Sequence, residues 1–252
     1  MSFKDKVVIV TGGSSGIGAA TAIAFSAQGA KVAIVGRNDK KLTAVAKKCK
    51  KPLVLVADVT KENDLQKIVN DTVKHFGKID ILINNAGIAQ SASILNDNAM
   101  AVFDQVMATN LRSCVYLTHL AAPHIIKTKG NIINISSIAA LRVVAKQTFA
   151  YNTSKAAMDH FTRSVAAELA SSGVRVNVVN PGPVKTDIIE NLGANEEQQK
   201  AVYERMRLMT ALGQVSDPEE IADLVLFLAS DKAKAITGAT FVSDYGSLIK
   251  AE

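Results

Sequence analysis

The sequence predicts an α/β fold, a doubly wound parallel sheet of about seven strands with helices on both faces. Short β-branched runs alternate with longer amphipathic segments along the whole chain, and this alternation is typical of βαβ units. A length of 252 residues, with 48% hydrophobic residues, fits one large domain with ample material for a core. The chain contains no low-complexity tract or repeat, so we expect a single domain over residues 1–252.

The first half of the chain supplies four predicted strands, and each is followed by a predicted helix. The first strand is the run KVVIV, and the fourth ends at Gly87. The predicted elements are strands 6–10, 31–36, 52–59 and 79–87 and helices 19–29, 40–50, 63–77 and 99–125.

The second half continues the same pattern. Pro181 stops a strand, and Pro218, followed by acidic residues, marks the start of a helix. The predicted elements are strands 130–137, 174–182 and 238–244 and helices 154–173 and 218–230. Because parallel strands are joined by right-handed crossovers, we expect a ligand site at the carboxyl ends of the strands.

Composition and charge limit the kinds of partner. The formal net charge is +6 and the isoelectric point is about 9.2. The lysine-rich run 40–51 contains no aromatic residue, so a solvated helix end is favoured over a nucleic-acid surface. The positive field still favours a polyanionic small ligand.

The cysteines and the N-terminus indicate a cytoplasmic protein. Cys49 and Cys114 lie far apart and match no metal or redox spacing, so we expect reduced thiols. The four histidines form no ligand pattern, and no metal is expected. No signal peptide or membrane span is visible, so no membrane partner is expected either.

A glycine-rich loop, TGGSSGIG, occupies residues 11–18 directly after the first predicted strand. Gly12 suits a tight turn, and Gly16 and Gly18 permit close approach of backbone and helix. The helix N-terminus that follows favours a pyrophosphate group. The strand-loop-helix context therefore predicts a dinucleotide site; the alternative is a glycine turn that only packs the helix on the sheet.

The segment YNTSK places Tyr151 four residues before Lys155. At helical spacing the two side chains share one face. A nearby cation favours the phenolate and lowers the pKa of the tyrosine, which would give a tuned proton donor. The alternative is a tyrosine packed on a lysine stem.

The glycine loop, the run Asn84-Asn85-Ala86-Gly87 and the pair Tyr151 and Lys155 together make the chain resemble the short-chain dehydrogenase/reductase family over essentially its whole length. The resemblance implies a Rossmann fold and a nicotinamide-dependent oxidoreductase in which the cofactor carries the hydride and the protein supplies position and a proton.

The resemblance also implies four catalytic residues. Tyr151 would be the general acid in carbonyl reduction and the base in alcohol oxidation, and Lys155 would lower its pKa and hydrogen-bond the nicotinamide ribose. Ser137 would hold the substrate oxygen, with Ser136 as a rival one residue away. Asn110 would support a lysine-linked proton relay, unless it is only a structural asparagine that bends a helix.

The residues after the second predicted strand bear on the choice between NADP(H) and NAD(H). NAD-binding sites of this type usually carry an acid there, whereas this chain has Gly36. Arg37 can bind a 2′-phosphate and Asn38 can add a donor, so NADP(H) is favoured over NAD(H). The alternative for Arg37 is an exposed turn residue, and Ser15 stands where some NADP-using relatives carry a basic residue.

The remaining cofactor contacts are also implied by the resemblance. Asp58 would contact the adenine, with Val59 beside it, although Asp58 could instead cap the following turn. Val184 and Thr186 would contact the carboxamide. The full cofactor set is Gly12, Ser14, Ser15, Gly16, Ile17, Gly18, Arg37, Asn38, Asp58, Val59, Asn85, Ala86, Gly87, Tyr151, Lys155, Pro181, Gly182, Val184 and Thr186.

Residues 186–212 would cap the substrate. This polar segment carries apolar residues that indicate a small hydrophobic ketone or secondary alcohol, unless they merely pack a helix: Ile188, Ile189, Leu192, Val202, Met206, Leu208 and Met209. Phe149 and Val143 could add to the pocket.

The family's usual Asp-Gly-Gly tail is here Asp244-Tyr245-Gly246. In the family this tail usually lies near subunit contacts, and a homotetramer is expected.

Three functions fit these observations. The first is an NADP(H)-dependent reductase of a small hydrophobic ketone, or the reverse oxidation of a secondary alcohol. The second is a 3-oxoacyl thioester reductase that acts on acyl carriers, which a basic surface would favour. The third is a nucleotide-sensing scaffold protein without catalysis, for which a broken catalytic tetrad would be expected.

Overall fold

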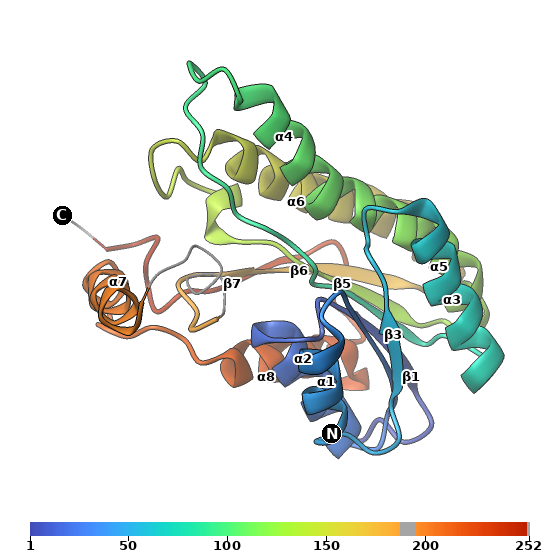
Figure 1. The fold of residues 1–252 in the computed structure, drawn as a ribbon. Helices are drawn as coiled ribbons and strands as arrows, with labels where there is room; N and C mark the ends of the chain where they lie inside the picture. Colours follow the sequence, from blue (N-terminus) through green and yellow to red (C-terminus); the bar gives the residue numbers. More distant parts are fainter. Residues whose placement is uncertain (187–194, 251–252) are drawn as a thin grey trace.

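The computed structural model describes residues 1–186 and 195–250. Its centre is one seven-stranded sheet with the strand order β3-β2-β1-β4-β5-β6-β7, and every neighbouring pair runs parallel. The order reverses between β1 and β4, the switch point where doubly wound folds bind their ligands. The predicted fold class is confirmed (Figure 1).

The strands are short and apolar because both faces of the sheet are covered. All five residues of β1 and of β5 are buried. The strands are β1 (Val7–Thr11), β2 (Lys31–Gly36), β3 (Leu53–Val56), β4 (Ile81–Asn84), β5 (Asn131–Ile135), β6 (Arg175–Pro181) and β7 (Thr240–Ser243).

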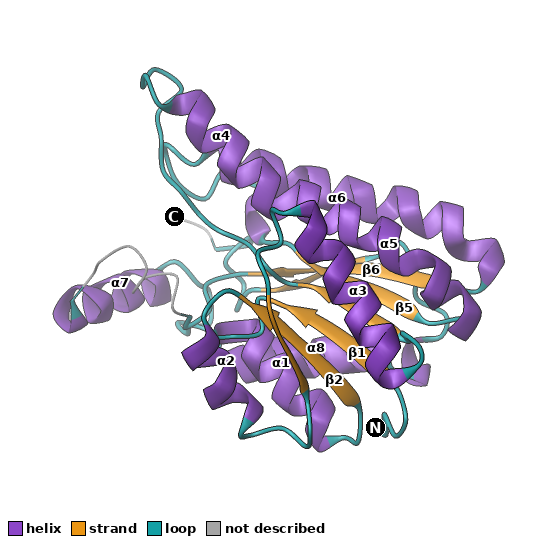
Figure 2. Ribbon diagram, turned by 45° about the vertical axis from the view of Figure 1, so that its right-hand side comes forward, coloured by secondary structure: helices purple, strands orange, loops and turns teal. Residues whose placement is uncertain are grey.

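Successive residues of β1 enter two separate cores. Val8 and Val10 of β1 pack in one core with α1 (Gly16–Ala27), α2 (Asp39–Ala46) and α8 (Pro218–Ala229). Ile9 packs in the other core with α3 (Glu62–Phe76), α5 (Ser113–Thr128) and α6 (Phe149–Leu169). This period of two is what a strand buried on both faces dictates, and Figure 2 shows the two helical layers.

The helix predicted over residues 99–125 is interrupted. It consists of α4 (Ala99–Met107), a π-helical turn η1 (Ala108–Arg112) and α5. Turns of this kind arise where a side chain breaks the regular helical ladder, and they often mark functional sites. Here the turn contains the completely buried Asn110.

Helix α6 begins at Phe149, earlier than the predicted start at residue 154. Asn152 donates its backbone N–H to the Thr148 carbonyl at 3.0 Å in the first turn. Asn and Thr have low helix propensity, so tertiary packing decides this start. Tyr151 and Lys155 therefore lie on consecutive turns of one helix.

Helix α7 (Glu196–Leu208) and three short 3₁₀ turns are further elements of the described structure. Helix α7 begins with a capping box formed by Asn195 and Gln198, and it stands out from the body of the molecule (Figure 1). Short 3₁₀ turns cover residues 138–140, 170–172 and 231–233.

Among the residues described, no helix combines the length and apolarity needed to cross a bilayer.

Candidate active site

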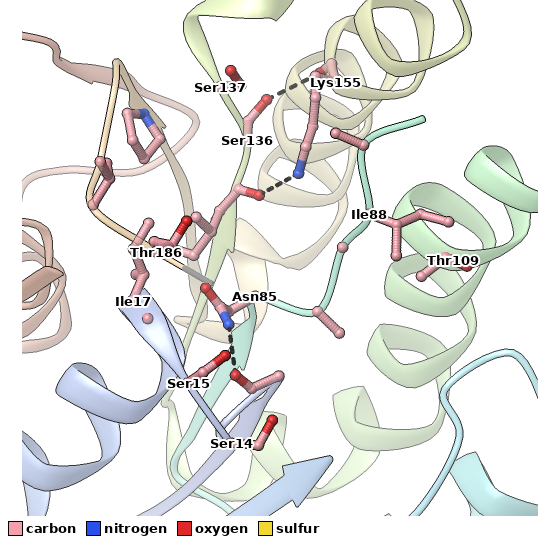
Figure 3. Close-up of a pocket in the computed structure, with 18 of the residues that line it drawn as sticks. Ser14, Ser15, Ile17, Asn85, Ile88, Thr109, Ser136, Ser137, Lys155 and Thr186 are labelled. Carbon is pink, nitrogen blue, oxygen red and sulfur yellow. Dashed lines mark hydrogen bonds between the residues drawn. The ribbon is translucent and has the colours of Figure 1, made fainter. Parts of the chain in front are cut away.

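A cavity of about 410 Å³ opens at the carboxyl ends of the central strands. Its wall combines the glycine loop after β1, the turns after β2 and β4, the end of β5, helix α6 and the segment after β6. Figure 3 shows these side chains around one space. The fold thus gathers residues from the whole length of the chain.

The glycine loop is shaped for close approach to a ligand. Gly12 and Gly16 have φ values of +64° and +52°, which glycine adopts without strain. A Cβ on Gly18 would lie 2.2 Å from the Gly12 carbonyl oxygen, so only glycine lets α1 pack here. In the described structure the Ser15 side chain, at the N-cap, makes no capping hydrogen bond. The first N–H groups of α1 therefore remain available to an anion.

Asn85 fixes this loop from the neighbouring strand. Its Nδ2 donates to the Thr11 carbonyl at 2.9 Å and to the Gly12 carbonyl at 3.3 Å. The backbone N–H groups of Asn85 and Ala86 donate to Thr11 Oγ1 at 3.0 Å each. Asn85 lines the cavity, as expected, but its amide group is committed to holding the glycine loop.

The three expected reacting side chains meet on one wall. Ser137, Tyr151 and Lys155 all line the cavity. Ser136 Oγ donates to the Lys155 carbonyl at 3.1 Å, whereas Ser137 Oγ accepts from the Ala139 N–H at 3.1 Å (Figure 3). Because the Ser136 hydroxyl is bound to helix α6, Ser137 is the better placed of the two serines to bind a substrate oxygen.

Lys155 is a buried cation with a lowered pKa. Its Nζ donates to the Ile135 carbonyl at 2.8 Å and lies 5.7 Å from the Tyr151 ring centroid. Burial lowers its pKa to about 8, while Cys114 and Asp159 act in the opposite direction. The side chain of Lys155 can therefore change between its ammonium form and its neutral amine form at a pH of about 8.

The pKa of Tyr151 corrects one expectation from the sequence. Burial raises the pKa of the phenol, and the hydrogen bond with the Ser137 side chain opposes this rise. Lys155 does not contribute the expected lowering; its ammonium group donates to the Ile135 carbonyl and lies over the Tyr151 ring, 5.7 Å from the ring centroid.

Asn110 lies behind the cavity wall. Its Oδ1 accepts from the Ile88 N–H at 2.8 Å, and its Nδ2 donates to the Ile88 carbonyl at 2.9 Å and to Ser154 Oγ at 3.1 Å. Its side chain is therefore a clamp between η1, the turn after β4 and helix α6. The adjacent Thr109 is the residue of η1 that lines the cavity.

The far end of the cavity holds the residues expected to select the cofactor. Gly36, Arg37, Asp58 and Val59 line it. A Cβ on Gly36 would already lie 3.3 Å from Ser14 Oγ, so Ser14 crowds the position where an acid would stand. Arg37 is exposed beside this turn.

Asn38 and Asp58 were also expected at this end, and the side chain of each makes hydrogen bonds that stabilise the local backbone. Asn38 lies outside the cavity wall and caps α2, since its Oδ1 accepts from the Lys41 N–H at 3.0 Å. Asp58 Oδ1 accepts from the N–H and hydroxyl of Thr60, which is the turn cap given as its alternative role. Burial acts to raise the pKa of Asp58, but these hydrogen bonds and the charge of Arg37 lower it overall.

The segment after β6 forms the opposite wall. Pro181, Gly182, Val184 and Thr186 line the cavity. A Cβ on Gly182 would lie 2.6 Å from Asp244 Cβ, so this glycine lets the segment pass close to the C-terminal turn. Backbone hydrogen bonds with Ser216 hold the segment in place.

Only part of the predicted substrate cap reaches the cavity. Met206 lines it, but Leu208 and Met209 are exposed. Ile188, Ile189 and Leu192 lie outside the described residues. Neither Val143, which is 75% exposed, nor Phe149, which stacks on Phe103 at 6.3 Å between ring centroids, is part of the wall.

Several wall residues were missing from the sequence-based prediction. They are Ala57, Ile88, Ala89, Thr109, Ile135 and Pro183. Each lies within two residues of a motif residue in the sequence, and that proximity was the available signal. Across residues 1–186 and 195–250, no group of three His, Cys, Asp or Glu side chains could hold a metal ion.

The amino-acid sequence of this chain is similar to a known family model and to characterised relatives. The family model described as enoyl-(acyl carrier protein) reductase matches residues 12–247. L-fucose dehydrogenase from Bos taurus is 35% identical over 91% of this chain and 84% of that protein. The 3-oxoacyl-[acyl-carrier-protein] reductase of Thermotoga maritima is 34% identical over 99% of this chain and 100% of that protein.

Solved structures resemble the whole chain. A short-chain dehydrogenase/reductase of unknown function from Caenorhabditis elegans, solved with cofactor, superimposes with a TM-score of 0.93. It is 36% identical in sequence, and the match covers 99% of this chain and 97% of that one.

Proposed function

The chain belongs to the short-chain dehydrogenase/reductase family, and from this premise we propose that it is an NADP(H)-dependent enzyme that interconverts a small hydrophobic ketone and its secondary alcohol. Oxidoreductase activity is common to the named relatives. The observation that carries the proposal is that Ser137, Tyr151 and Lys155 line the same cavity as the glycine loop.

The cavity fits a dinucleotide. Gly12 and Gly16 line it, and a Cβ on Gly12, Gly16 or Gly18 would come within 3 Å of neighbouring protein atoms, so the loop needs glycine to keep its shape. The N-terminus of α1 offers backbone N–H groups to a pyrophosphate. The segment from Pro181 to Thr186 would hold the nicotinamide end. A bound nicotinamide cofactor supplies the hydride chemistry.

The side chains of this chain supply the proton and the orientation. In reduction the Tyr151 hydroxyl gives its proton to the substrate oxygen, and in oxidation its oxygen receives that proton. The Ser137 hydroxyl hydrogen-bonds the same substrate oxygen. Lys155, on the same helix face as Tyr151, would hydrogen-bond the nicotinamide ribose, as the family resemblance implies, and Asn110 ties the turn at Ile88 to Ser154 on helix α6.

Preference for NADP(H) rests on the turn after β2. Gly36 carries no acid that would repel a 2′-phosphate, and the contact with Ser14 crowds the space for one. Arg37 lines the same end of the cavity, and a guanidinium group can bind a phosphate with two parallel hydrogen bonds. Asp58 would face the adenine from the turn that its side chain caps.

Apolar wall residues support a hydrophobic substrate. Ile88, Ala89, Pro183 and Met206 line the cavity. Hydrophobic pockets with few polar groups are typical of sites for apolar small molecules. The relatives named for a sugar and for an acyl-carrier substrate show that this family scaffold accepts varied groups.

A second candidate is reduction of a 3-oxoacyl thioester. The matching family model and the Thermotoga relative both carry acyl-carrier names, and the formal charge of +6 would favour an acidic carrier. Acetoacetyl-coenzyme A tests this candidate beside a panel of hydrophobic ketones. A higher kcat/KM for the thioester would favour the second candidate over the first.

The assembly and the location belong to the same proposal. We infer a homotetramer from the family resemblance, and light scattering on the purified protein measures it. Cys49 and Cys114 are free thiols, which fits the reducing cytoplasm. The scaffold alternative would gain support only if cofactor binding occurred without turnover of any substrate.

The proposed chemistry is tested with Tyr151→Phe. This variant keeps the ring but removes the proton donor, so ketone reduction with NADPH should fall by a factor of about 10² or more. Binding of NADPH, followed by fluorescence, should stay within about twofold of the unmodified protein. A variant as active as the unmodified protein would contradict the role of Tyr151.

A further inference from the structure

A buried carboxylate with no role in the proposed mechanism lies on the helix that carries Tyr151 and Lys155. Asp159 follows Lys155 by one helical turn and is only 3% exposed. Burial of a carboxylate costs free energy unless hydrogen bonds or an opposite charge compensate it. Its surroundings therefore indicate what the carboxylate does.

Asp159 is joined to Ser137 through one amide group. Asn180 Nδ2, at the end of β6, donates to Asp159 Oδ2 at 2.8 Å and to the Ser137 carbonyl at 3.1 Å. A carboxylate can only accept hydrogen bonds, so Asp159 fixes the orientation of the Asn180 amide with its N–H groups toward both acceptors. The backbone of Ser137 is thereby tied to helix α6.

Of the two carboxylate oxygens of Asp159, Oδ2 accepts the hydrogen bond from Asn180. Asp159 Oδ1 is buried and has no hydrogen-bond partner among the described residues. Burial raises the pKa of Asp159, while the neighbouring Ser136 and Asn180 side chains and the charges of Arg163 and Lys155 lower it. The two cations that act on this carboxylate are thus Arg163 and Lys155, both on α6.

Asp159 also places a carboxylate one helical turn from Lys155. Burial lowers the pKa of Lys155, and Cys114 on α5 and Asp159 on α6 oppose this effect. Burial raises the pKa of the Cys114 thiol to about 12 and raises that of Tyr151, so both are uncharged at neutral pH. Among the groups that act on Lys155, Asp159 is therefore the carboxylate that favours its protonated form.

We propose that Asp159 is a positioning residue for the oxidoreductase reaction, which acts on Ser137 through the Asn180 amide and, by its charge, on Lys155 one helical turn away. Its effect on turnover rests on the proposed function, whereas its effect on Lys155 does not. The carboxylate thereby connects Ser137, which would orient the substrate oxygen, to Lys155, which would hold the nicotinamide ribose.

The test measures Lys155 directly, without turnover. Protein labelled with ¹³C at the lysine ε-carbon is titrated by NMR, and Lys155→Met identifies the signal of Lys155. Asp159→Asn keeps the shape of the side chain and removes its charge. The titration midpoint of Lys155 should fall by about one pH unit in Asp159→Asn. Glu168→Gln, which removes an exposed acid from the same helix, should leave the midpoint unchanged.

Kinetics then test the consequence for the reaction. In Asp159→Asn the kcat for ketone reduction should fall about tenfold, and the basic limb of its pH profile should move to lower pH. NADPH affinity should stay within about twofold, since Asp159 is not part of the cavity wall. An unchanged Lys155 midpoint, or a lower kcat without a shift in the pH profile, would overturn the proposal.

A variant that fails to fold does not decide the question. Asp159→Ser is smaller, leaves room for water and should lower the Lys155 midpoint in the same direction. If Lys155 responds as expected but the unmodified protein turns over no carbonyl substrate, the proposed function fails while the link between Asp159 and Lys155 stands.

Discussion

The ammonium group of Lys155 donates a hydrogen bond to the carbonyl oxygen of Ile135 at 2.8 Å. This contact joins helix α6 to the end of β5, immediately before Ser136 and Ser137. It holds the cation at the cavity wall, 5.7 Å from the centre of the Tyr151 ring. The arrangement makes the protonation of Lys155 sensitive to its burial, and several measurable consequences follow from that.

Lys155 should make the stability of the protein depend on pH in a defined window. Its pKa is lowered from 10.5 to about 8 by burial, so between these values the unfolded chain binds more protons than the folded one. Stability therefore rises with pH in this window, by at most about 1.4 kcal/mol per pH unit. Urea unfolding of the unmodified protein and of Lys155→Met at pH 7.5 and pH 9.5 measures the difference. An equal change in both proteins would contradict the lowered pKa.

Gly18→Ala should disrupt the glycine loop. The added Cβ would lie 2.2 Å from the Gly12 carbonyl and 2.4 Å from Asn85 Nδ2, so the loop and its clamp must shift. We expect NADPH affinity to fall by a factor of about 10², as the loss of roughly two charge-assisted hydrogen bonds implies. Isothermal titration calorimetry measures this.

Gly213→Ala is the matched control for that change. Unlike Gly18, Gly213 has a positive φ, of +64°, and a Cβ there would meet nothing within 4 Å. Alanine should cost about 1 kcal/mol of stability through backbone strain and leave NADPH affinity unaltered. Equal losses of affinity in both variants would show that a general loss of stability, and not the shape of the loop, determines binding.

Asn110→Ala should lower both stability and turnover. The substitution removes three hydrogen bonds and leaves the Ile88 N–H and carbonyl without their partner. Unsatisfied polar groups of this kind cost about 1–3 kcal/mol each when buried, so the free energy of unfolding should fall by about 2–4 kcal/mol. Thermal and urea unfolding measure this loss. A variant of unchanged stability would contradict the clamp.

Much of the fold could be predicted because period-two burial and strand-end motifs are local signals. The run KVVIV, for example, becomes β1 within a residue of its predicted bounds. The interruption of the helix predicted over residues 99–125 could not be predicted. Asn110 in the π-helical turn contacts Ile88, which is distant in the sequence. The same reason explains the late predicted start of α6.

The candidate site was predicted best where a motif fixes the chemistry. Ser137, Tyr151 and Lys155 could be placed together from spacing and resemblance, and the structure brings them to one wall. The role of Asn38 as a helix cap and the commitment of the Asn85 amide to the glycine loop depend on side-chain geometry that no spacing reveals. Val143 and Phe149 were expected from position alone, and their side chains make other contacts or face solvent.

The most direct test of the central claim is a fluorescence titration of the purified protein with NADPH and with NADH, for the unmodified chain and for Arg37→Asp. A guanidinium–phosphate contact contributes about 1.5–3 kcal/mol, so NADPH should bind about 10- to 100-fold more tightly than NADH. Arg37→Asp should narrow or reverse that gap. Equal or NADH-favoured binding in the unmodified protein would contradict the assignment of Arg37, and binding of neither nucleotide would contradict the proposed oxidoreductase function itself.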